Sequence, residues 1–252
     1  MLNKYTTFYL VVLVAVVSAR AENINLSNAL QNSNVLKDSR RWDGLGLTAT
    51  VNDYVDLTLT YVTRFIESQG LDPMPLPDIE EGFEVRPIWV TYSALLRVYD
   101  GRMTGLTRVS RYGDQQVSYF AKMLRVRLQL QFSNLEIIYR YIVRVMNIGP
   151  SGGITALLER FNVVVDVLID FNNDEIHLQE FKLTDVGRLR VQLTGNPLVD
   201  WLVNPVINVF TRMFNGPIIR AVQTNIRSAV QSQIDVLNGN LQAIIARLES
   251  HN

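Results

Sequence analysis

The chain of 252 residues contains no cysteine, and this absence excludes a disulfide framework, a thiol nucleophile and cysteine-based metal sites. An excess of charge is also missing, because 24 Lys and Arg residues balance 24 Asp and Glu residues. Nucleic-acid-binding domains usually carry a basic excess, so we expect no nucleic-acid partner. The two histidines, His177 and His251, accompany no nucleophile, phosphate-loop or zinc motif. We therefore expect a protein that is not an enzyme and that uses no cofactor or metal.

The N-terminus has the pattern of a secretory signal. Lys4 precedes an apolar run from Phe8 to Val17, and Ala19-Arg20-Ala21 follows as a small-x-small cleavage sequence. The run is too short to span a bilayer core of about 30 Å. We predict that residues 1–21 are a signal peptide and that the mature protein is secreted and extracellular.

The remaining chain divides into two parts. Residues 22–50 are rich in Asn, Ser and charged residues, which predicts a flexible lead-in. The lead-in includes Asn25 in an Asn-Leu-Ser sequon, a candidate glycosylation site. Residues 51–252 contain every strongly periodic segment and are predicted to form a single elongated domain.

Residues 51–69 are predicted to form an amphipathic helix that begins near Asn52 or Asp53 and ends at Gly70. Its apolar residues recur at helical spacing, at Val51, Val55, Leu59, Val62 and Ile66. Residues 71–79 follow with alternate prolines, which forbid a helix and predict an extended connector.

Between Phe83 and Leu193 the apolar period changes to two, which is typical of strands. The clearest alternation runs through residues 124–132 and continues through 135–145, and we predict a long hairpin with its turn at Ser133-Asn134. Further strands are predicted at 88–98, 104–110, 116–122, 163–169, 176–183 and 189–193. The expected turns and loops lie at Asp100-Gly101, Gly113-Asp114, 148–153 and 171–175.

The stretch from Gly195 to Leu237 is predicted to be one long helix, with Asn196 as its N-cap and Pro197 at its first position. Residues 197–214 are apolar around most of the helix circumference, and the part after Pro217 has a one-sided apolar stripe. The helix would be on the order of 60 Å long if continuous. Asn215-Gly216-Pro217 should kink it or briefly interrupt it, and Pro205 should bend it. The sequence Asn238-Gly239-Asn240 should end it, leaving a short amphipathic tail.

These elements predict an α+β fold. A sheet with one apolar face can cover a helix that is apolar on nearly every side only by curling around it. We therefore expect a highly curved antiparallel sheet wrapped around the long C-terminal helix, with a shorter N-terminal amphipathic helix.

Three groups of polar residues admit a plain and a functional interpretation. Arginines on the outward phase of the strands form either a solvated face, with partners such as Glu136 and Asp166, or a docking ridge for anionic lipid headgroups; they are Arg125, Arg127, Arg140, Arg144, Arg188 and Arg190. The acidic loop that starts at Asp170 resembles part of a calcium loop but lacks its glycine and its last glutamate, which favours a hairpin turn. His177 is interpreted as a structural or exposed side chain.

Four segments together resemble the insect and mite group 7 allergen family. They are 70–79 (GLDPMPLPDI), 105–114 (GLTRVSRYGD), 148–152 (IGPSG) and 181–202, which begins FKLTDVGRLRV. The family belongs to a tubular lipid-binding fold shared with takeout-like, juvenile-hormone-binding and bactericidal/permeability-increasing proteins. The chain lacks the N-terminal cysteine pair common in the takeout-like and hormone-binding relatives, which places it with the allergen branch.

The resemblance implies a secreted carrier that holds a fatty acid, terpenoid or lipid in an apolar tube between helix and sheet. The candidate lining consists of Leu128, Leu130, Phe132, Val163, Val165, Val167, Trp201, Leu202, Val206, Val209, Phe210, Met213 and Phe214, with Met123 and Met146 as further adaptable side chains. The alternative is a surface-recognition protein with a filled core that binds microbial lipid, a membrane or a partner protein. Any contact of the carrier with a membrane should be transient.

Overall fold

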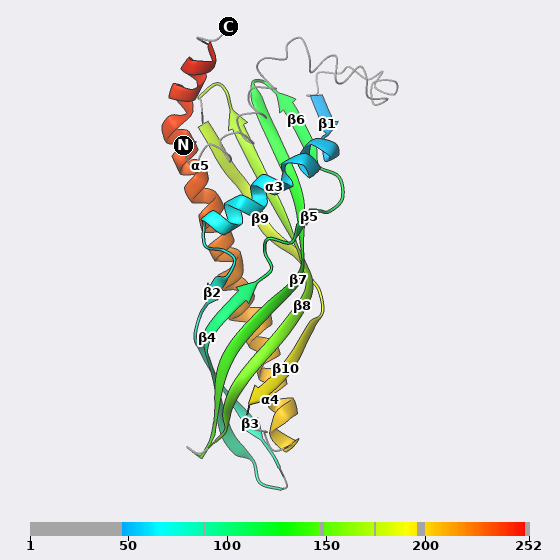
Figure 1. Cartoon of the computed structure of the whole chain (residues 1–252), viewed down its shortest axis with the longest axis vertical. Helices are drawn as coiled ribbons and strands as arrows, with labels where there is room; N and C mark the ends of the chain where they lie inside the picture. The colour runs from blue at the N-terminus through cyan, green and yellow to red at the C-terminus, as the bar shows by residue number, and fades with distance from the viewer. Residues whose placement is uncertain (1–46, 88, 147–148, 174, 196–199, 250–252) are drawn as a thin grey trace.

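In the computed structural model, a single antiparallel sheet of ten strands curves around a long C-terminal helix (Figure 1). This architecture is the one that the apolar periodicities predict. The structure describes residues 47–249 except 88, 147–148, 174 and 196–199. The predicted signal peptide, the candidate glycosylation site at Asn25 and the predicted helix start at Asn196 and Pro197 therefore lie outside the described residues.

Two long strands form the spine of the sheet. β7 (Met123–Val145) and β8 (Ser151–Asp170) are antiparallel and pair from Met123↔Asp170 to Ile142↔Ser151. At about 3.3 Å per residue such strands extend over roughly 70 Å, which matches the length of the C-terminal helix.

Shorter strands extend this spine at both ends (Figure 1). The upper half gains β1 (Leu47–Thr50), β5 (Val109–Arg111), β6 (Gln116–Phe120) and β9 (Glu175–Val186). The lower half gains β2 (Met74–Leu76), β3 (Ile79–Val85), β4 (Tyr92–Thr104) and β10 (Leu189–Gly195). β1 lies within the predicted flexible lead-in, so the last four residues of that segment form part of the sheet.

The predicted hairpin turn at Ser133-Asn134 is wrong, because β7 runs straight through it. In this strand the most buried positions are even-numbered up to Phe132 and odd-numbered from Leu135. β8 changes parity at the same level, between Leu158 and Phe161, while the pairing register is kept. Asn134 adopts a φ of 54° at the centre of this switch. Both strands therefore switch which alternate residues face the interior, near the middle of the sheet, without reversing direction.

The predicted turn at Asp100-Gly101 is also wrong, because β4 passes through it as a bulge between Tyr99 and Arg102. Asp100 has a φ of 54°, a conformation that aspartate tolerates better than most residues. A Cβ on Gly101 would lie 2.2 Å from the Tyr139 ring, so only glycine lets this ring pack against the strand.

The other predicted strands agree with the structure to different degrees. The predicted strand at 88–98 is confirmed in part, since residues 92–98 belong to β4, and the one at 104–110 contributes Thr104 to β4 and residues 109–110 to the short β5. Those at 116–122, 163–169, 176–183 and 189–193 are confirmed as β6, part of β8, β9 and β10. The predicted extended connector is confirmed in part, because three of its residues form β2.

The predicted N-terminal amphipathic helix is confirmed as α3 (Asn52–Ser68). It ends as predicted at Gly70, whose φ of 64° allows the amide N–H groups of Gly70 and Leu71 to bond back to the carbonyls of Glu67 and Ile66. α3 lies across the upper half of the sheet, where it contacts β5 (Figure 1).

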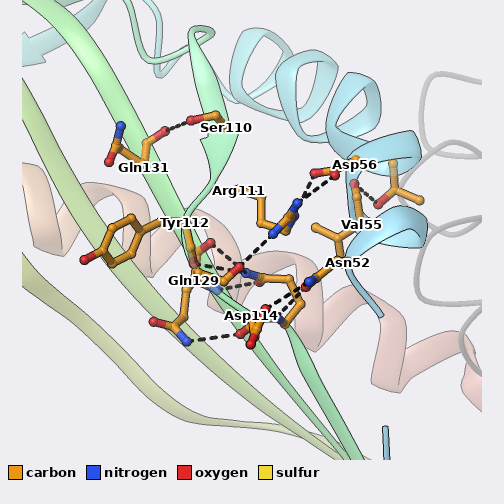
Figure 2. A network of polar contacts seen from close by, with 12 residues as sticks. Asn52, Val55, Asp56, Ser110, Arg111, Tyr112, Asp114, Gln129 and Gln131 are labelled. Carbon is orange, nitrogen blue, oxygen red and sulfur yellow. Dashed lines mark hydrogen bonds and ion pairs between the residues drawn. The ribbon is translucent and has the colours of Figure 1, made fainter. Parts of the chain in front are cut away.

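Polar contacts fix α3 to the sheet (Figure 2). The Asp56 carboxylate accepts two hydrogen bonds from Arg111, of 2.9 and 3.1 Å, and these lower the pKa of Asp56 below its ordinary value. Asn52 bonds to Asp114 through its side-chain amide and accepts the backbone N–H of Gln115. The buried Gln115 side chain is satisfied entirely by backbone groups, including both the N–H and the C=O of Gln129.

The long helix is continuous within its described residues. It consists of α4 (Asp200–Met213), one π-helical turn, η2 (Phe214–Ile218), and α5 (Ile219–Glu249). Pro217 has no N–H to donate, and the wider turn accommodates it without ending the helix. Of the two expectations at Asn215–Pro217, a local distortion is therefore correct and a break is not.

The predicted end of the helix at Asn238-Gly239-Asn240 is wrong, since α5 continues to Glu249. The Asn238 side chain does not cap the helix. Its amide accepts the Ile176 N–H at 2.7 Å and donates to the Ile176 carbonyl at 2.8 Å, which ties the helix to the start of β9.

Replacing Gly101 tests the bulge in β4. We expect Gly101→Ala to lower the free energy of unfolding by about 1–3 kcal/mol, because the added methyl group would displace the buried Tyr139 ring. Gly216→Ala in the π-helical turn is the matched control, since nothing lies within 4 Å of its Cβ. Urea denaturation should show the control unchanged or more stable by up to about 1 kcal/mol. Equal stability of the two variants would contradict this account of the bulge.

Candidate functional site

The inner face of the long helix is apolar over its whole lower half. Leu202, Val206, Val209, Phe210 and Met213 are each at most 3% exposed, at the spacing that puts them on one side of α4. The predicted lining residue Phe214, at the start of η2, is fully buried beside them.

The predicted lining residues of the sheet are buried, but they do not lie opposite α4. Leu130, Phe132, Val163 and Val165 are at most 9% exposed, and Leu128 and Val167 are partly buried against the same core. They all belong to the upper half of β7 and β8, where α5 rather than α4 faces the sheet (Figure 1). The predicted set thus spans two levels of the interior rather than one site.

The strand residues that face α4 come from the second half of β7 and the first half of β8. The Tyr139 and Phe210 rings meet edge to face with centroids 5.9 Å apart. Ile137, Ile154, Ala156 and Leu158 are fully buried at the same level. Chain connectivity indicates which part of the sheet faces α4. The helix follows β10 after four residues, and β10 pairs with Gly152–Leu158 of β8.

Trp201 and Met146 lie outside the interior. Trp201, in the first turn of α4, is 39% exposed, and Met146, after the end of β7, is 71% exposed. Met123, at the start of β7, is partly buried.

The interior is occupied by large side chains. Phe132 and Phe161 stack with ring centroids 4.8 Å apart, and Phe161, Phe210 and Phe214 are fully buried. A surface hollow of about 450 Å³ lies at the start of α3, lined by residues 50–53, away from the interface of the long helix with the sheet.

Tyr139 and Tyr141 place two phenols in this apolar interior. The Tyr139 hydroxyl donates to the Pro77 carbonyl at 3.0 Å. The Tyr141 side chain is 1% exposed, and its hydroxyl has no hydrogen-bond partner among the described residues. Burial raises the pKa of both phenols, so both are neutral at physiological pH. The Tyr141 ring lies over Gly152 of β8, where a Cβ would be 3.0 Å from the hydroxyl oxygen.

The outward arginines lie on the exposed face, as the strand alternation predicts. Arg125 holds the fully buried carboxylate of Asp166 with three contacts of 2.6–3.0 Å, which raises the pKa of Arg125. Arg127 and Arg140 make longer and exposed contacts, of 4.0 Å to Glu180 and 3.5 Å to Asp100. Arg144, Arg188 and Arg190 are exposed and make no ion pair with the described residues.

The remaining polar candidates have local roles. The Asp170 carboxylate accepts the backbone N–H of Asn172 at 2.8 Å and the side-chain amides of Asn172 and Asn173, which lowers the pKa of Asp170 and supports its interpretation as a turn. The His177 side chain is half-exposed and lies 3.3 Å from Glu175. Within the described part of the chain, no helix is both long and apolar enough to cross a membrane.

The sequence model of the group 7 allergen family matches residues 50–234. The chain belongs to this family, and the match confirms the resemblance seen in its motifs. No curated protein matches the sequence.

Two solved structures have a similar arrangement at 14% sequence identity. A lipopolysaccharide binding protein aligns over 78% of this chain with a TM-score of 0.43, and the chain spans only 40% of that protein's length. Takeout 1 of Epiphyas postvittana aligns over 70% of this chain and 91% of its own, with a TM-score of 0.41.

The contact between Arg125 and Asp166 can be tested by stability. We expect Arg125→Leu to lower the free energy of unfolding by about 1–3 kcal/mol, because the Asp166 carboxylate would remain buried without its partner. Arg127→Leu is the matched control, since its ion pair is exposed and should contribute less than about 1 kcal/mol. Similar losses in the two variants, measured by chemical denaturation, would show that the buried carboxylate does not depend on Arg125.

Proposed function

We propose that this protein is a secreted, non-enzymatic carrier that binds a fatty acid, terpenoid or similar lipid between the long helix and the curved sheet. The interior between them is apolar on both sides. Its buried side chains lie between Leu202 and Phe214 on the helix and include Ile137 of β7 and Leu158 of β8 on the sheet. Membership of the group 7 allergen family supports the proposal through the lipid-binding fold that this family shares with takeout-like proteins.

Burial of the apolar part of such a ligand supplies enough free energy for binding. Burying one CH₂ group contributes roughly 0.8 kcal/mol, so a chain of a dozen carbons gains about 10 kcal/mol before the costs of association. This gain requires no charged partner, which suits an interior selective for size and apolarity.

The ligand would have to move side chains aside, because large residues fill the interior in this structure. Several of these residues are adaptable. Met74, Met103 and Met213 are each at most 1% exposed in the main core, and methionine changes shape more easily than branched or aromatic residues. Flexible core residues are therefore present at the levels of β2, β4 and α4.

The observation that carries the proposal is the unpaired hydroxyl of Tyr141. Buried polar groups in native proteins nearly always have a hydrogen-bond partner, and a missing partner needs an explanation. A carboxyl, hydroxyl or carbonyl oxygen at the end of an apolar ligand would provide one. The ligand would then lie with its polar end at Tyr141 and its apolar part along α4.

Tyr141→Phe tests this arrangement through affinity. Removing one hydrogen bond to a neutral group should weaken binding of a fatty acid or fatty alcohol by about 2- to 10-fold. Binding of a hydrocarbon of equal length should not change. Competition against a fluorescent fatty-acid probe measures both affinities.

The matched control is Tyr139→Phe, because the Tyr139 hydroxyl already has a partner in Pro77. This variant should lose stability without losing selectivity for polar-headed ligands. The orientation is wrong if Tyr141→Phe binds every ligand like the unmodified protein. The carrier function itself is wrong if no fatty acid, terpenoid or lipid displaces the probe.

A second candidate function is surface recognition of a microbial lipid, a membrane or a partner protein, with no internal ligand. The filled interior favours it, as do three exposed arginines that make no ion pair with the described residues, Arg144, Arg188 and Arg190. Binding through these arginines should weaken strongly between low and physiological salt, because exposed charges are screened over about 8–10 Å. Uptake into the apolar interior should be nearly independent of salt.

A further inference from the structure

One end of the molecule exposes large apolar side chains on three separate segments. Trp89 is 82% exposed, Met146 71%, Val90 57% and Trp201 39%. We call these four residues the apolar tip. Trp89 and Val90 lie in the β3–β4 loop, Met146 follows β7, and Trp201 is in the first turn of α4, all at the lower end of the molecule (Figure 1).

The strand registers bring these segments together. Val85 pairs with Tyr92 to close the β3–β4 hairpin, and Ala94 of β4 pairs with Val145 of β7. Met146 therefore leaves the sheet on the strand next to the one that carries the Trp89 loop. The Trp89 loop and Met146 therefore lie at neighbouring strand ends, and the first turn of α4, which carries Trp201, lies at the same end of the molecule (Figure 1).

Exposure of this kind requires an explanation, because tryptophan side chains are usually largely covered. The loops at the opposite end of the sheet are more polar, with Lys122, Asn172 and Glu175 exposed there. Phe120 is an exposed aromatic residue at that end, but its neighbours in sequence, Ala121 and Lys122, are small or charged.

The charges at the apolar tip cancel. Arg86 and Arg144 are exposed near it, and so are Glu84 and Asp200. A charged partner would therefore meet no net charge of opposite sign at the tip. The recognition has to come from the apolar side chains themselves.

The size and shape of the tip favour a lipid surface over a protein. The four side chains expose roughly 500 Å², since an aromatic side chain covers up to about 250 Å² and the exposed fractions of methionine and valine add to the two tryptophans. A stable protein partner needs about 800 Å² on each side. An end with two exposed tryptophans suits the boundary of a bilayer, where tryptophan is enriched because its ring is apolar and its N–H is polar.

We propose that the apolar tip docks the protein on phospholipid bilayers, with Trp89 inserted at the boundary between headgroups and acyl chains. The long axis of the molecule then points away from the membrane, and the remaining sheet stays in water. Docking does not require an internal ligand, so it can be tested separately from the carrier function.

Sedimentation with phosphatidylcholine vesicles tests the proposal. We expect Trp89→Ser to lower the partition coefficient at least about tenfold, since it removes the most exposed side chain of the tip. Phe120→Ser is the matched control, because Phe120 is 56% exposed at the opposite end and should leave binding unchanged. Binding should change less than about twofold between low and physiological salt, as the tip has no net charge.

A spectroscopic readout locates the insertion. In a variant with Trp42 and Trp201 replaced by phenylalanine, the emission of Trp89 should shift to shorter wavelength on vesicles and be quenched by brominated lipid. Equal loss of vesicle binding in the Trp89 and Phe120 variants would overturn the proposal. So would Trp89 emission that brominated lipid does not quench. Failure of vesicle binding together with normal displacement of a fatty-acid probe would reject the docking and leave the carrier function standing.

Discussion

The structure depends on one constraint, which is that the C-terminal helix carries a continuous apolar face, buried from Leu202 to Leu237, and that this face needs cover along its whole length. Here β7 and β8 run beside the helix for most of their 23 and 20 residues, and the other strands widen the cover at each end. The parity switch at Asn134 keeps apolar side chains on the inner face while the sheet twists past its waist.

The same constraint separates the two faces of the sheet chemically. On the inner face nearly every side chain is apolar, so a polar group there that lacks a partner, such as Tyr141, is an exception. On the outer face Asp166 is fully buried and is compensated by Arg125. Tyr141 precedes Met146 by five residues on β7, or about 17 Å of strand. The proposed polar end of the ligand and the proposed membrane contact therefore lie toward the same end of the molecule, which would shorten the path between a bilayer and the interior.

Much of this fold follows from sequence periodicity, since the apolar period identifies α3, the long helix and most strands. The errors occur where one local signal has two structural solutions. A change of parity with Ser-Asn or Asp-Gly fits a turn as well as an irregularity within a continuous strand. Only the long-range pairing, of β7 with β8 and of β4 with β7, decides for the continuous strand. At Asn238 a contact with Ile176, 62 residues away in sequence, outweighs the local preference of Asn-Gly to end a helix.

The predicted interior residues are buried or partly buried with the exceptions of Trp201 and Met146, but sequence could not place them at their levels along the helix. Periodicity shows which face a residue occupies. It does not show which part of β7 lies beside α4, because that depends on strand pairing. Tyr141 was not predicted as a site residue for a related reason. In the apolar alternation of β7 it occupies the position of any core residue, and only the structure shows that its hydroxyl has no hydrogen-bond partner among the described residues.

Native mass spectrometry of the protein purified from a eukaryotic secretion host, with extraction and identification of bound molecules, tests the central claim most directly. The account predicts one apolar molecule per chain, released by organic solvent and replaced when a fatty acid or terpenoid is added. A protein that carries no such molecule and takes none up from solution would contradict it.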